Sequence, residues 1–124
     1  MTNALLVLAG GGLGALARYW LTGVVHRNLG SVFPYGTVAV NIAGCFVIGV
    51  LMVALEDRFL VNPSLRVFLA IGILGGFTTF SSFSYETIAL LRDGEFLYGC
   101  LNVLISVGAC LGATYAGTLA GKLL

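Results

Sequence analysis

Hydrophobic residues occupy four long stretches of the chain, and polar or charged residues gather in the short segments between them. The first two stretches run from about 4 to 25 and from 36 to 55. The third begins after Asn62-Pro63-Ser64, where Asn62 or Ser64 is expected to cap a helix, and ends near residue 91. The fourth runs from 96 to about 119. Because a helix needs roughly 20 apolar residues to cross a bilayer, the pattern predicts four transmembrane helices in one domain, residues 1–124.

Composition supports an all-α integral membrane protein. Hydrophobic residues make up 59% of the chain and charged residues 9%, and the mean hydropathy is +1.04, well above the values of soluble domains. The net charge of +1 gives no basic surface for nucleic acid. The N-terminus lacks the basic region and cleavage site of a signal peptide, so we expect the first stretch to be retained. Four helices enclose little interior, which favours an oligomer.

The third stretch is interrupted by a polar segment, residues 75–86, which reads GGFTTFSSFSYE. A glycine pair, Gly75-Gly76, weakens the helix, and hydroxyl groups then alternate with phenyl rings up to Glu86. Within a bilayer, a broken helix is tolerated only where its backbone groups face protein, water or an ion. We therefore expect the helix to break near Gly75-Gly76 and the segment to belong to a functional site.

Polar residues of all four stretches fall in the same half of the membrane when the helices are drawn as alternating in direction. They are Arg18, Asn41, Ser81, Ser82, Ser84, Glu86, Asn102 and Ser106. Unsatisfied polar groups are costly in hydrocarbon, so clustering at one depth indicates that they face one another or water. The cluster is interpreted as half of a permeation path.

Two ionisable groups of this cluster have alternative interpretations. Arg18 either extends its guanidinium to the nearby interface or acts as an electrostatic anchor, which attracts an anion or pairs with Glu86. Glu86 is interpreted as a hydrogen-bonded structural acid, because no chain of proton-carrying partners accompanies it.

Several polar side chains recur at helical spacing. Thr37 and Asn41 share one face of the second stretch, and the fourth carries a polar stripe of Asn102, Ser106, Cys110, Thr114 and Thr118. The stripe either lines a wet pore or joins helices by hydrogen bonds. Phe80 and Phe83 share one face of the half-helix after the break, and the positive edges of their rings suit a small anion.

The glycine-rich start, with Gly12, Gly14 and Ala17, imitates a dinucleotide-binding turn. That fold needs an acidic residue about 20 positions later, and none occurs before Glu56. The spacing of Gly10 and Gly14 predicts a close contact between helices instead. The three cysteines, Cys45, Cys100 and Cys110, form no CxxC pair and are interpreted as packing residues.

Positive charges give almost no orientation bias. Arg58, Arg66 and Lys122 lie on the side of the N-terminus, and Arg27 and Arg92 lie on the other, with Arg18 embedded toward it. Either the topology is weakly specified, or the chain inserts in both directions and pairs as an antiparallel dimer.

Three motifs together resemble the Fluc (CrcB-type) fluoride channel family over essentially the whole chain. They are the glycine-rich first span ending in Arg18-Tyr19, the residues Gly36-Thr37-x3-Asn41-x2-Gly44, and the segment 75–86. The resemblance implies antiparallel, dual-topology homodimers with two pores in the prokaryotic inner membrane. It also implies passive fluoride export and no enzymatic activity.

The resemblance also implies site residues. Phe80, Phe83 and Asn41 would line the fluoride path, with Ser81 and Ser106 along or near it and Thr37, Glu86 and Arg18 beside it. The backbone carbonyls of Gly75 and Thr78 from both subunits would hold a structural Na⁺ on the dimer axis. Asn102 and Cys110 depart from the family pattern.

Two other functions stay open on the sequence. A small multidrug exporter also has four spans, but its first span carries an acidic residue, whereas here that span carries only Arg18. A membrane assembly protein that transports nothing would use the same polar cluster only to join helices.

Overall fold

The fold was analysed in a computed structural model, which describes residues 1–58 and 62–124, and this part of the chain is helical with no strand. The first segment is α1 (Thr2–Leu29), and the second is α2 (Tyr35–Val53) with its π-helical continuation η1 (Ala54–Arg58). The third comprises α3 (Pro63–Arg66), the π-helical η2 (Val67–Leu74), α4 (Gly75–Phe77) and α5 (Phe80–Arg92), and the fourth is α6 (Phe96–Lys122). All four segments are long and apolar enough to cross a membrane, which confirms the predicted spans.

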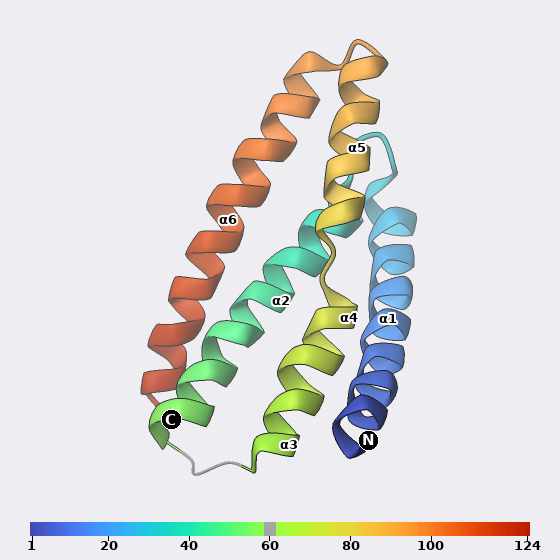
Figure 1. Cartoon of the computed structure of the whole chain (residues 1–124). Coiled ribbons are helices and arrows are strands. Elements are labelled where there is room, and N and C mark those ends of the chain that lie inside the picture. Colours follow the sequence, from blue (N-terminus) through green and yellow to red (C-terminus); the bar gives the residue numbers. More distant parts are fainter. Residues whose placement is uncertain (59–61) are drawn as a thin grey trace.

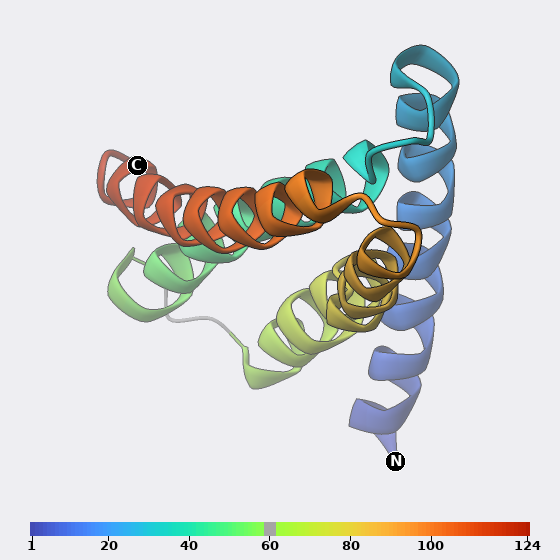
Figure 2. The same ribbon diagram turned by 90° about the horizontal axis from the view of Figure 1, so that it is seen from above.

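Successive segments alternate in direction. In Figure 1 both termini lie at the lower end, and the connections α1–α2 and α5–α6 lie at the upper end. Helix α2 packs along α6, and α1 packs against η2 and α4. Seen from above, α6 and α2 run side by side while α1 crosses beside the third segment (Figure 2). The third segment therefore packs on α1, and α1 also contacts α2 directly.

Glycines set how closely these helices approach. A Cβ atom at Gly10 would lie 2.7 Å from the carbonyl oxygen of Phe68, and one at Gly14 would collide with the carbonyl of Ile73. This confirms the helix contact predicted from the spacing of Gly10 and Gly14. The same glycines lie within one continuous helix, whereas a dinucleotide-binding fold would place a strand and a turn there. Between α2 and α6, Gly49 likewise faces backbone of the opposite helix.

Local signals explain where the helices begin and end. The side chain of Asn62 accepts a hydrogen bond from the amide of Ser64 at 2.8 Å, so Asn62 is the cap of α3, and Pro63 occupies its first turn. Gly30 and Gly94 follow α1 and α5 with φ angles of 82° and 81°, which side chains with a Cβ rarely adopt. Both glycines lie in the connections at the end opposite the termini.

The third segment is broken near the predicted glycine pair, but not at the glycines themselves. The pair Gly75-Gly76 remains helical within α4, and the break lies at Thr78 and Thr79. Both threonines have extended backbone, with ψ angles of 158° and 117°. Gly76 serves packing instead, because a Cβ atom there would lie 2.5 Å from the carbonyl oxygen of Gly11 on α1.

The chain by itself buries little of its apolar surface. Only 11–28% of the most apolar window of each segment is buried within the chain. Among the described residues the buried hydrophobic side chains are few: Phe33, Val38, Val40, Val53, Leu74 and Leu90. Most large apolar side chains therefore face outward, as expected of helices that cross a membrane.

Candidate functional site

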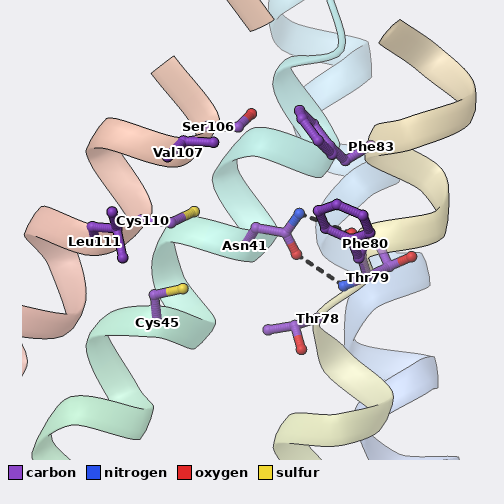
Figure 3. A pocket seen from close by; sticks show the side chains of 10 residues that line it. All are labelled: Asn41, Cys45, Thr78, Thr79, Phe80, Phe83, Ser106, Val107, Cys110 and Leu111. Atoms are coloured by element: carbon purple, nitrogen blue, oxygen red, sulfur yellow. Dashed lines mark hydrogen bonds between the residues drawn. The ribbon is translucent and has the colours of Figure 1, made fainter. Parts of the chain in front are cut away.

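Asn41 on α2 holds the broken backbone of the third segment. Its Nδ2 donates to the carbonyl oxygen of Thr79 at 2.9 Å, and the Thr79 amide donates back to Oδ1 at 2.8 Å (Figure 3). One side-chain amide thus satisfies both backbone groups of a residue that has left the helix. In a bilayer these groups would otherwise lack partners, so Asn41 stabilises the break.

The break redirects the amides that would have completed the helix. In an unbroken helix the amide of Thr79 would donate to the carbonyl of Gly75, and that of Ser82 to the carbonyl of Thr78. Here the Thr79 amide donates to Asn41, and the Ser82 amide donates to the hydroxyl of Thr79 at 3.2 Å. The carbonyls of Gly75 and Thr78 therefore lose their helical partners.

Thr79 also begins the next helix. Its hydroxyl caps α5 by accepting from the Ser82 amide, and it lies 3.2 Å from the hydroxyl oxygens of both Ser81 and Ser82. Thr79 was not singled out from the sequence, although a threonine directly before the first residue of an amphipathic helix is a usual capping signal.

Phe80 and Phe83 lie beside Asn41 at an open pocket of about 340 Å³ (Figure 3). Their ring centroids are 5.3 Å apart and the rings are tilted by 49°, which confirms that they share one face of α5. Phe80 is 77% exposed. The pocket is completed by residues of the break and of α2 and α6: Cys45, Thr78, Thr79, Ser106, Val107, Cys110 and Leu111.

A second, more polar pocket of about 530 Å³ lies on the α1 side of the break. Its lining comprises Arg18, Thr22, Thr37, Thr79, Ser81, Ser82, Tyr85 and Glu86. Most of the polar residues predicted to lie at one depth thus gather around two pockets that share Thr79.

Arg18 contacts the backbone of the third segment rather than Glu86. Its Nε donates to the carbonyl oxygen of Gly76 at 3.1 Å, and no ion pair joins it to Glu86 in the part of the chain that the structure describes. In an unbroken helix the amide of Phe80 would donate to the carbonyl of Gly76, but Phe80 lies beyond the break. Arg18 donates to this carbonyl in its place. Among the described residues, Oε1 of Glu86 is buried without a hydrogen-bond partner, so the expectation of a hydrogen-bonded structural acid is wrong for this oxygen.

Asn102 joins α6 to α5 rather than lining a pocket. It is 1% exposed, its Nδ2 donates to the hydroxyl of Thr87 at 2.9 Å, and its Oδ1 accepts from Ser106 at 3.3 Å. The hydroxyl of Thr87 in turn donates to the carbonyl oxygen of Phe83 at 2.7 Å. At Asn102 the stripe on α6 therefore joins helices, while Ser106 and Cys110 also reach the pocket of the phenyl rings.

Comparison with known proteins identifies relatives over nearly the whole chain. Residues 5–118 match the family described as "CrcB-like protein, Camphor Resistance (CrcB)". Proteins named "Fluoride-specific ion channel FluC" from Geobacter sulfurreducens and Geotalea uraniireducens are each 51% identical, over 98% and 100% of both chains. A protein of the same name from Geotalea daltonii is 54% identical over 90% of both chains. The chain therefore belongs to the CrcB family.

Proposed function

We propose that the protein is a fluoride-selective ion channel, a multi-pass protein of the bacterial inner membrane that lets fluoride leave the cell passively. One observation carries the proposal. A pocket formed by two phenyl rings and an asparagine amide lies against a helix that breaks within a membrane-spanning segment. The relatives are aligned with this chain over 90–100% of their own lengths, and their names support the same function.

The groups around the phenyl pair suit a small anion. The ring edges of Phe80 and Phe83 carry partial positive charge. The Nδ2 of Asn41 has two hydrogens, and one remains after its bond to Thr79. Fixed donors of this kind replace the hydration shell of a small ion, and larger halides fit the same positions poorly. The hydroxyl of Ser106 donates to Asn102, so it must exchange that bond before it can serve an anion.

The polar pocket would serve as the adjoining part of the path. Arg18 supplies positive charge there, and the hydroxyls of Thr37 and Ser81 supply donors. Glu86 would hold water or accept from a hydroxyl through its partnerless oxygen. An anion would pass from this pocket along α5, past Ser81, to Phe80 and Phe83.

The carbonyls of Gly75 and Thr78 fit a structural Na⁺. Both have lost the amides that an unbroken helix would supply, and carbonyl oxygens are ligands for hard cations. Gly75 is exposed at the surface of the subunit, where a second copy would bring the same two carbonyls to the ion. Bound there, Na⁺ would coordinate these unpaired oxygens and link the two broken segments.

We further propose that the active form is an antiparallel homodimer with two pores. One subunit leaves Phe80 and Gly75 exposed, so its candidate path and its candidate sodium site both lack a wall. A second subunit in the opposite orientation would supply that wall, and the weak charge bias permits both orientations. Labelling of engineered loop cysteines from both sides of the membrane supports this arrangement, and labelling of each loop from one side only contradicts it.

Liposomes that contain the purified protein test the function. We expect fast fluoride efflux without a proton gradient, while chloride is retained. The substitutions Phe80→Ile and Phe83→Ile keep an apolar side chain but remove the ring edge, and each should cut the flux sharply while the dimer persists. Proton-coupled export of organic cations would support a multidrug exporter. No flux above that of protein-free vesicles would leave a membrane assembly protein.

A further inference from the structure

Two cysteines from different helices meet in the wall of the pocket of the phenyl rings. Cys45 on α2 and Cys110 on α6 both line this pocket. Figure 3 shows both sulfur atoms directed into the pocket, on the side where Asn41 lies. Neither residue takes part in the proposed contacts with fluoride, and both are free thiols.

The packing of α2 against α6 fixes the position of the two thiols. Cys45 precedes Gly49 by one helical turn, and Cys110 precedes Thr114 by one turn. A Cβ atom at Gly49 would collide with the carbonyl of Thr114, so the two backbones touch directly beside the thiols. The sulfur atoms are therefore held near each other in the folded subunit, without any movement of the helices being needed to bring them together.

We propose that Cys45 and Cys110 form a binding site for a soft, thiophilic cation that accepts two sulfur ligands. Thiolates select soft cations over the hard ions that oxygen ligands prefer. With Hg²⁺ as the cation, each thiol loses its proton, two S–Hg bonds form and two protons leave, so no oxidant or reductant is required. The product is neutral overall, as suits a site within the membrane.

A cation bound there would block the fluoride path. This consequence rests on the proposed function, whereas the binding itself does not. The metal would occupy space in a pocket of about 340 Å³ beside Asn41 and opposite the phenyl rings. It would also link α2 to α6 next to the side chain that holds the broken backbone. We therefore expect flux through an occupied subunit to stop.

Binding is measured first, on the purified protein in detergent. Hg²⁺ is titrated in the presence of an excess monothiol, which removes metal held by one sulfur, and the ultraviolet absorbance of the mercury–thiolate bonds is recorded. We expect one ion per subunit. Cys45→Ser and Cys110→Ser should each weaken binding at least about 100-fold, because the chelate is lost. Cys100, exposed near the start of α6, gives the matched control, and Cys100→Ser should bind as the wild type does.

Equal binding by the wild type and by Cys45→Ser or Cys110→Ser would overturn the site, as would loss of binding in Cys100→Ser. Circular dichroism of each variant separates loss of the ligand from loss of the fold.

The block is then tested in liposomes. Hg²⁺ should stop fluoride efflux through the wild type and Cys100→Ser but not through the other two variants, and a dithiol should restore it. Flux that continues with both thiols occupied would overturn the block. Absence of flux before Hg²⁺ is added would refute the proposed function, and the binding arm decides the site independently of it.

Discussion

The substitution Asn41→Ala removes the side chain that holds the broken backbone. It leaves the amide and the carbonyl of Thr79 without the partners that now lie at 2.8 and 2.9 Å. Leaving a buried hydrogen-bonding group unsatisfied costs about 1–3 kcal/mol, so two such groups give about 2–6 kcal/mol. Both bonds are only partly buried, and we therefore expect a loss of about 2–4 kcal/mol in the free energy of unfolding.

Unfolding by a denaturing detergent in mixed micelles, followed by the fluorescence of Trp20, the one tryptophan of the chain, measures this loss. Asn41→Asp is the matched control, because its carboxylate still accepts from the Thr79 amide but no longer donates to the Thr79 carbonyl. It should recover part of the stability lost in Asn41→Ala. If both variants unfold within about 0.5 kcal/mol of the wild type, Asn41 does not support the break and this reasoning is wrong.

Other contacts give predictions that the same unfolding assay checks. Gly14→Ala places a Cβ against backbone of η2 and should cost about 1–3 kcal/mol, whereas Gly12→Ala, which meets nothing within 4 Å, should be neutral; equal effects would contradict the close packing of α1. Asn102→Ala leaves the hydroxyl of Thr87 without its buried donor and should cost about 1–3 kcal/mol, with fluoride flux largely retained; a full loss of flux in a stable variant would place Asn102 in the path. Arg18→Leu removes the charge from the polar pocket and the donor to α4, so fluoride efflux should slow; an unchanged rate would exclude Arg18 from the path.

Features with a short-range cause could be predicted from the sequence. Hydrophobic length gave the four membrane-spanning segments, and glycines four residues apart gave the contact of α1 with η2. The spacing of Phe80 and Phe83 placed both rings on one face of α5. These features depend on one segment or on a spacing of a few residues, so a single sequence contains all the information that they need.

The position of the break depends on a distant partner instead. Glycine weakens a helix locally, which pointed to Gly75-Gly76, but the helix opens where a side chain 38 residues away can satisfy the freed backbone. The contact of Arg18 was equally hard to predict, because its partner is a backbone carbonyl 58 residues away. Every residue has such a carbonyl, so the residue types in the sequence do not point to it. For Asn102 the choice between lining a pore and joining helices depended on what lies beside it, and its hydrogen bond to Thr87 on α5 shows that it joins helices.

The central claim is that this protein conducts fluoride passively and selectively. Its most direct test is the reversal potential of the purified protein in a planar bilayer, with a fluoride gradient across the membrane and equal chloride on both sides. The account predicts a current that reverses at the equilibrium potential of fluoride and does not move when a chloride gradient is added. A current that follows chloride or protons, or no current at all from a correctly folded protein, would contradict it.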